Sequence, residues 1–159
     1  MKMRNFKILC LAIIMTGCTN MCSTSHKDMK PEEVVEAYLD TSFNIVNVDQ
    51  ISDLIQYTSG NLKQALEAAD AKTVSKVFVH KKYNLKRFSI LERKDRTPRE
   101  VEITYELAYN EIDKKNDDAL VTAENTLNLR LKEGAWYITD VIGGKTAIDF
   151  QAPMVVKPN

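Results

Sequence analysis

The clearest structural signal in this chain is the stretch Leu127-Asn128-Leu129-Arg130-Leu131-Lys132-Glu133-Gly134-Ala135-Trp136-Tyr137-Ile138. Apolar and polar residues alternate on both sides of its centre, which is typical of strands with one buried face. The central Glu133-Gly134 is a two-residue hairpin signal. The sequence therefore predicts an antiparallel hairpin with Leu131 opposite Trp136 and Leu129 opposite Ile138.

The segment from Tyr83 onward also has an apolar period of two, which predicts two further strands. They can be aligned by requiring that apolar faces meet, with turns at Asp95-Arg96-Thr97-Pro98 and at Lys114 to Asp118. The first turn gives the pairs Phe88 with Tyr105, Ile90 with Ile103, Arg87 with Glu106 and Arg93 with Glu100. The second gives Ile103 with Leu129, Tyr105 with Leu127 and Glu102 with Arg130. The expected result is an antiparallel meander with one apolar face.

Helices are expected ahead of the strands. Pro31-Glu32-Glu33 favours a helix start, because proline suits a first helical position and carboxylates complement the helix dipole. Asp49 can cap a short second helix, Gly60 can end it before a third over residues 62–69, and residues 71–79 favour a helix over a strand. The apolar stripe of the first helix is Val34, Ala37, Tyr38, Thr41 and Ile45, and Asn44 or Asn47 can end it. The fold class is α+β: amino-terminal helices packed on a curved antiparallel sheet of four or more strands, in one domain over residues 31–150.

A resemblance to a known superfamily rests on residues 31–39, Pro-Glu-Glu-Val-Val-Glu-Ala-Tyr-Leu, and 133–141, Glu-Gly-Ala-Trp-Tyr-Ile-Thr-Asp-Val. Helices that lead into a sheet ending in such a tryptophan strand resemble the cone-shaped, cystatin-like domains named after nuclear transport factor 2. The chain looks most like the small bacterial envelope lipoproteins of that group. It departs from many members in having no early short hairpin between its helices.

The amino terminus has the zones of an export signal. Lys2, Arg4 and Lys7 precede the short apolar run Ile8 to Met15, which is shorter than a membrane-spanning helix needs. Met15-Thr16-Gly17-Cys18 resembles the lipobox of bacterial lipoproteins, although leucine is more usual at the position of Met15. The resemblance implies a signal peptide over residues 1–17, acylation of Cys18 with chains such as palmitate, a flexible tether over residues 18–30 and a bacterial envelope location. Residues 151–159 are expected to form a tail.

Two details qualify this location. Thr19 follows the acceptor cysteine where an aspartate would retain some lipoproteins, so the resemblance implies an outer membrane anchor that faces the periplasm. Cys10 leaves with the signal and Cys18 carries lipid, so the remaining Cys22 lacks an intramolecular disulfide partner. Cys22 is either an unimportant exposed thiol, which we favour, or a site of pairing with another chain.

Charge and motifs exclude several functions. The signal holds three basic and no acidic residues, so its removal changes 22 basic and 22 acidic side chains to 19 and 22, a net charge of about −3. This balance does not predict nucleic-acid binding. Two histidines and no usable cysteine pair do not support a metal site, and no cofactor is expected. Gly143-Gly144-Lys145-Thr146 lacks the first glycine of a phosphate loop, because Thr139 stands there.

One basic region lies within residues 81–99. It could attract an anionic partner such as lipid headgroups or cell-wall polymer. We favour a second interpretation, a solvated sheet face on which carboxylates pair with these cations, because the predicted register brings Glu100 and Glu106 next to them. The cations are Lys81, Lys82, Lys86, Arg87, Arg93, Lys94, Arg96 and Arg99.

A set of polar-tipped side chains is expected on the apolar face of the meander. Continuing the last hairpin places Asp140 opposite Leu127 and Asn125 opposite Ile142. Superfamily enzymes such as ketosteroid isomerase use carboxylates and tyrosines in the cone, which implies Asp140 as a base and Tyr105 or Tyr38 as a donor to an oxyanion. We favour a structural or non-catalytic pocket, because no motif of those enzymes matches this chain residue by residue. The candidate pocket residues are Tyr38, Tyr105, Tyr109, Asn125 and Asp140.

Two function classes therefore follow from the sequence. The first, which we favour, is a membrane-anchored, non-catalytic envelope lipoprotein that binds a small apolar ligand or a partner protein and could form a homodimer. The second is an anchored isomerase-like or hydrolase-like enzyme with an acid/base pocket around Asp140.

Overall fold

The computed structural model describes residues 26–80, 83–111 and 119–150. It contains the helices α1 (Pro31–Asn44), α2 (Ile51–Ile55), α3 (Gly60–Ala68) and α4 (Ala71–Val74), and the strands β1 (Tyr83–Thr97), β2 (Glu100–Glu111), β3 (Ala119–Lys132) and β4 (Ala135–Phe150). Short 3-10 turns form at η1 (His26–Asp28) and η2 (Val48–Gln50), and a π-helical turn, η3 (Ser75–Val79), follows α4. The expected α+β class is confirmed.

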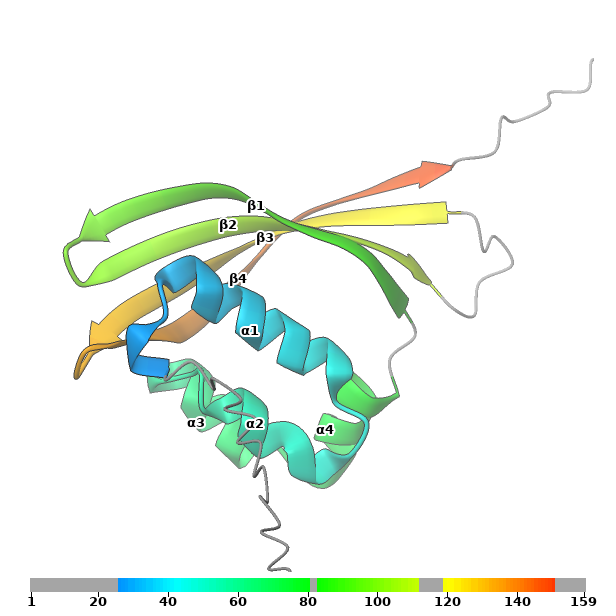
Figure 1. Ribbon diagram of the computed structural model, residues 1–159. Coiled ribbons are helices and arrows are strands. Elements are labelled where there is room, and N and C mark those ends of the chain that lie inside the picture. Colours follow the sequence, from blue (N-terminus) through cyan, green and yellow to red (C-terminus); the bar gives the residue numbers. More distant parts are fainter. Residues whose placement is uncertain (1–25, 81–82, 112–118, 151–159) are drawn as a thin grey trace, which may run out of the picture.

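The strands form one antiparallel sheet in the order β1-β2-β3-β4. The sheet is curved, α1 crosses its concave face, and α2 to α4 lie beyond α1 (Figure 1). We call the helix-covered side the inner face and the opposite side the outer face. The core lies between α1 and the inner face, where Val34 and Leu39 cluster with Ile103, Leu127 and other apolar residues.

The helix boundaries follow from local chemistry. Pro31 opens α1 as expected, and the Lys30 amide donates to Glu33 Oε2 over 2.7 Å, which satisfies one free N–H of the first turn. The predicted cap at Asp49 is wrong. Asn47 caps η2 instead, because its side-chain oxygen accepts from the Asp49 amide and its backbone is extended. Residues 71–79 are helical, as the sequence favoured.

The predicted pairing of β3 with β4 is correct near their turn. Leu131 lies opposite Trp136 and Leu129 opposite Ile138. Glu133 and Gly134 have φ values of 54° and 84°, as a tight turn with left-handed residues requires. One edge of β4 is closed here, because Ile138 exchanges backbone hydrogen bonds of 2.9 Å with Tyr57 and Ser59.

The predicted pairing of β1 with β2 is wrong by two residues at Phe88 and Ile90 and by three residues at Arg93. The turn lies at Pro98-Arg99 rather than at residues 95–98, and three register shifts interrupt β1. These shifts insert extra residues into β1. The two-residue slip leaves Phe88 and Ile90 facing inward, whereas the shift after Ile90 turns Arg93 to the inner face, opposite Ile103. The observed pairs are Phe88 with Leu107, Ile90 with Tyr105 and Arg93 with Ile103.

The predicted pairing of β2 with β3 has the same two-residue error. Tyr105 lies opposite Asn125 rather than Leu127, and Ile103 lies opposite Leu127 rather than Leu129. Glu102 lies opposite Asn128 rather than beside Arg130. The predicted turn over residues 114–118 lies outside the described residues, as do the signal peptide with Cys18, Thr19 and Cys22, and the tail over residues 151–159.

The η1 turn lies inside the segment that the sequence assigns to the tether. The His26 ring packs edge-on against Tyr57 and Tyr137, with centroid distances of 5.5 and 4.8 Å. This end of the segment therefore docks onto β4. Within the described part of the chain, none of the helices is both long enough and apolar enough to cross a membrane.

Candidate functional site

A bulge in β4 determines where the candidate site residues lie. Ile138 pairs with Leu129, but the next pair joins Asp140 to Asn128, so Thr139 is an extra residue. Thr139 donates its hydroxyl hydrogen to the Asn128 carbonyl over 3.1 Å. Because one inserted residue reverses the faces of the strand beyond it, Asp140 shares the outer face with Asn128. The predicted position of Asp140 opposite Leu127 is therefore wrong, and Val141 takes that place.

The other candidate pocket residues lie on the inner side of the sheet. Asn125 lies opposite Tyr105, and Tyr109 lies further along the same face, opposite Val121. The predicted pairing of Asn125 with Ile142 is wrong by one residue, because Asn125 lies opposite Gly143. The sheet itself therefore separates the three inner residues from Asp140.

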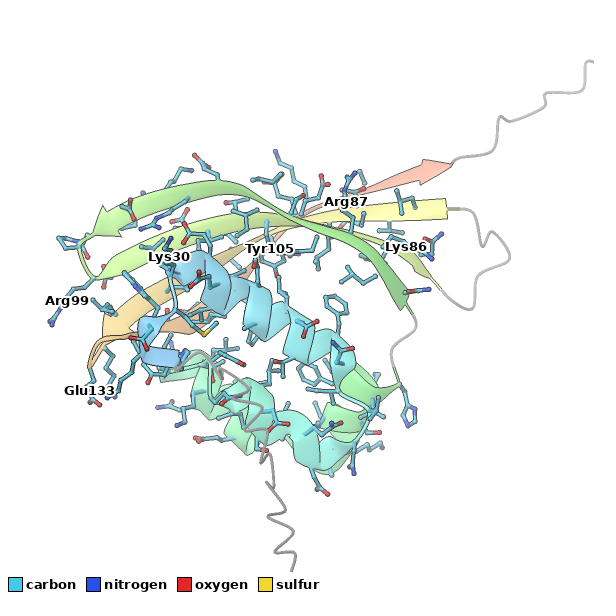
Figure 2. The ribbon with its side chains drawn as sticks, in the orientation of Figure 1. Lys30, Lys86, Arg87, Arg99, Tyr105 and Glu133 are labelled. Atoms are coloured by element: carbon cyan, nitrogen blue, oxygen red, sulfur yellow. The ribbon has the colours of Figure 1, made fainter. Side chains whose placement is uncertain are left out.

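Tyr38 approaches Tyr105 from α1, as the sequence anticipated. The two side chains are only 7% and 4% exposed, and Figure 2 shows Tyr105 between the sheet and α1. Burial raises the pKa of each phenol to about 12, and for Tyr105 the nearby Tyr38 adds to the rise. The Tyr105 ring also packs at a tilt on Phe88, with 5.9 Å between centroids. Both phenols thus remain protonated at neutral pH and form part of the core.

Asp140 borders a groove on the outer face. The groove has a volume of about 270 Å³ and is formed where the ends of β1 and β2 meet β3 and the bulge of β4. Its volume is slightly below the range of about 300–1,000 Å³ that is typical for small-molecule sites. Its lining residues are Arg96, Glu100, Val101, Asn128, Leu129, Arg130, Thr139 and Asp140.

The two guanidinium groups of the groove are already paired. Arg96 donates through Nε and Nη2 to Glu102 Oε2 over 2.8 and 2.6 Å. Arg130 Nη2 donates to Glu100 Oε1 over 2.6 Å. The half-buried Asp140 carboxylate, in contrast, has no hydrogen bond or ion pair with any residue that the structure describes. The groove therefore has one uncompensated negative charge.

The sequence did not reveal this groove as a site. Asp140 was singled out, but its neighbours Asn128 and Thr139 were not, because their proximity depends on the bulge. Glu100 and Arg130 form an ion pair with each other. The predicted register had instead placed Glu100 beside Arg93 and Arg130 beside Glu102. No local sequence signal marks a bulge in an otherwise alternating strand.

Four cations of the basic region pair with carboxylates, as we favoured, although Arg93 lies on the inner face, opposite Ile103. The Arg87–Glu106 pair was predicted and has an N–O distance of 2.7 Å. The predicted Arg93–Glu100 pair is wrong, because Arg93 instead bonds Glu32 of α1 and Asp95, each over 2.8 Å.

The side chains of Lys86 and Arg99 point outward (Figure 2) and make no ion pair with a described residue. Lys94 pairs with Glu92 and Arg96 with Glu102, while Lys81 and Lys82 lie outside the described residues.

No group of three or more metal-ligating side chains occurs among residues 26–80, 83–111 and 119–150. His80 is exposed at the end of η3.

Comparisons with known proteins concern the fold. No family model matches the chain, and no curated protein is similar to it. Solved structures that align with it include the Ntf2-like potential transfer protein TraM from the Gram-positive conjugative plasmid pIP501, with 13% identity over 75% of this chain and 92% of that chain and a TM-score of 0.47.

Two further structures have similar values. VirB8 from Agrobacterium tumefaciens is 17% identical over 79% of this chain and 98% of its own, with a TM-score of 0.43. An NTF-2 like protein of unknown function from Shewanella oneidensis MR-1 is 12% identical over 70% and 100%, with a TM-score of 0.42. Each similarity concerns the general arrangement of helices and sheet, and none assigns a role to a residue of this chain.

Proposed function

We propose that this chain is a bacterial envelope lipoprotein, anchored through Cys18, whose cone-like α+β domain is a non-catalytic module for binding a partner protein. The anchor rests on the order of basic, apolar and small residues before Cys18. Two acyl chains on one cysteine would suffice for stable attachment, whereas one chain binds a bilayer only marginally. The absence of aspartate after Cys18 supports the outer membrane as its location.

One observation supports a module over an enzyme: Tyr105 and Asp140 lie on opposite faces of the sheet. An acid/base mechanism needs its base and its oxyanion donor within hydrogen-bond reach of one substrate. A strand layer separates these two groups.

Burial also favours a partner protein over a small apolar ligand. Tyr38 and Tyr105 are covered by the protein itself, while the outer face carries a groove and the side chain of Ile142 is 50% exposed. A single exposed apolar side chain is ordinary on a protein surface, so the support for a partner protein comes from the open groove beside it.

The module is tested by native mass spectrometry of the full chain, extracted in a neutral detergent. We expect masses of the acylated chain alone or bound to protein, including a homodimer if two copies associate. A co-purified small molecule that is lost in Tyr105→Phe but retained in the control Tyr57→Phe would instead support a ligand pocket or an enzyme.

The anchor is tested by fractionating cells that express the wild type or Cys18→Ser. The wild type should be found with membranes and should incorporate a labelled fatty acid. Cys22→Ser is the matched control, because it removes a neighbouring thiol without touching the acceptor. Equal labelling of wild type and Cys18→Ser would refute the anchor and leave the fold unaffected.

A further inference from the structure

We infer that the outer-face groove is a binding site for a cationic side chain, a lysine or arginine of the partner protein, with Asp140 as its counter-ion. The inference rests on the proposed function as an interaction module and gives the partner a chemical requirement.

The charge of the groove is negative. Arg96 and Arg130 face three carboxylates, those of Glu100, Glu102 and Asp140. Two of these carboxylates are bonded to the two guanidinium groups, and Asp140 is left over. A half-buried carboxylate loses part of its hydration without gaining a partner, so an incoming cation would offset that cost.

The groove also has carboxylate oxygens that are free to accept hydrogen bonds. Asp140 offers two carboxylate oxygens, and Glu100 uses only Oε1 in its bond to Arg130. The Asn128 side chain adds an amide oxygen, and Thr139 has already donated its hydroxyl hydrogen to the Asn128 carbonyl. Ammonium and guanidinium groups of a partner can donate to these carboxylate oxygens.

The bulge makes this arrangement possible. If Thr139 instead paired regularly with Asn128, Asp140 would lie opposite Leu127 and point inward, where a carboxylate would have to be buried among apolar groups. With the bulge, Asp140 stands beside Asn128 at the wall of the groove. The bulge in β4 thus directs a charged side chain into a depression, a use for which bulges are known.

An apolar border lies next to the groove along β4. Ile142 pairs with Thr126, whose hydroxyl lies 3.1 Å from that of Thr104 on the outer face. Ile142 therefore lies on the outer face, two residues beyond Asp140 along β4, at a spacing of about 7 Å. The methylene stem of a lysine or arginine can lie on such a side chain while its charged end reaches the carboxylate. The groove volume of about 270 Å³ suits one side chain better than a larger ligand.

The test is an NMR titration of the isotope-labelled full chain in a neutral detergent. The probe is N-acetyl-arginine N-methylamide, and its uncharged isostere N-acetyl-citrulline N-methylamide is the control ligand. We expect the arginine probe, and not the citrulline probe, to shift the amide resonances of Asn128, Thr139 and Asp140. The shifts should decrease with added salt, as screening of an ion pair requires.

Variants then assign the effect to one carboxylate. Asp140→Asn should weaken probe binding about two- to fivefold, which corresponds to an exposed ion pair. Asp140→Glu should retain most of the binding, and Asp53→Asn, which removes an exposed carboxylate on α2, should leave it unchanged. Asp140→Lys should abolish it, because the new cation repels the probe.

Three outcomes would overturn the inference: equal responses to both probes, unchanged binding in Asp140→Asn, or shifts at the groove only with N-acetyl-glutamate. A wild-type spectrum without shifts up to the solubility of the probe would also refute it. None of these outcomes affects the proposed anchor or the non-catalytic assignment, which are tested by fractionation and native mass spectrometry.

Discussion

The two halves of β4 differ in how their sequence determines their structure. The first half, Ala135 to Ile138, follows a tight turn, faces the core and is closed at its edge by Tyr57 and Ser59. The second half, from Asp140 onward, has its register shifted by the bulge and leaves Val141 and Ile142 44% and 50% exposed. Turn chemistry therefore sets register only as far as the first inserted residue.

The largest expected effect contrasts two isoleucines of this one strand. Ile138→Ala should destabilise the protein by about 2–5 kcal/mol, because its fully buried side chain would leave a cavity in the core. Ile142→Ala should change the free energy of unfolding by no more than about 0.5 kcal/mol, because that side chain is half exposed. Urea denaturation measures both. Similar losses would show that the second half of β4 is covered in the native protein.

Alanine substitutions at two adjacent glycines test the second half of β4 separately from the first. A Cβ on Gly144 would overlap the backbone carbonyl of Glu124, whereas a Cβ on Gly143 would meet nothing within 4 Å. We expect Gly144→Ala to destabilise by about 1–3 kcal/mol, because backbone must move to relieve the overlap. Gly143→Ala should cost much less. Thermal melting of both variants measures the difference. An equal effect would contradict the close approach of β3 and β4 at their second register shift, between Ala123 and Asn125.

The turn that begins the first half should tolerate asparagine better than alanine. Gly134 has a φ of 84°, which is unfavourable for most side chains. Gly134→Ala should therefore destabilise by about 1–2 kcal/mol, and Gly134→Asn should cost less because asparagine adopts positive φ more readily. Chemical denaturation measures the difference. If alanine were as stable as glycine, turn chemistry would not be what aligns the first half.

The smallest effect concerns pH and the packing of η1 on the first half. Burial lowers the pKa of His26, and a weaker opposing effect comes from the Trp136 backbone. Because the folded pKa lies below the unfolded value, His26 contributes stability that is present above pH ~6.5 and is lost as the pH falls toward the folded pKa.

Melting temperatures between pH 7.5 and 5.5 measure this contribution. The wild type should lose stability relative to His26→Phe as the pH decreases, since phenylalanine keeps a ring against Tyr57 and Tyr137 and does not titrate. Parallel curves for the two proteins would mean that His26 is solvated in solution.

Much of the fold could be predicted because it depends on local patterns. The start of α1 at Pro31, the helical character of residues 71–79 and the turn at Glu133-Gly134 each follow from a few neighbouring residues. The alternation of apolar residues predicted the strands correctly, and it predicted their inner face correctly as far as the register shifts of β1 and β4. A two-residue error in pairing keeps every side chain on its face, so the apolar pattern does not distinguish the alternative registers of β1, β2 and β3.

The candidate site could be predicted only in part, for the same reason. Tyr38 and Tyr105 meet as expected because both lie on strongly apolar stripes. Asp140 does not join them, because a single-residue bulge reverses its face, and the alternating sequence around Thr139 contains no signal for that bulge. Charge pairing was also a weak guide. Arg93 forms an ion pair with Glu32, a residue distant in sequence, instead of with the predicted Glu100.

The backbone exchange between Ile138 and residues 57–59 also bears on the kinetics of folding. It joins positions about 80 residues apart, whereas the pairs of the meander connect strands that follow one another in the sequence. Closing so long a loop carries an entropic cost that short hairpins avoid. We expect the sheet to form first and this junction with the helical layer to close after the rate-limiting step, so that Thr58 substitutions accelerate unfolding and leave the folding rate nearly unchanged.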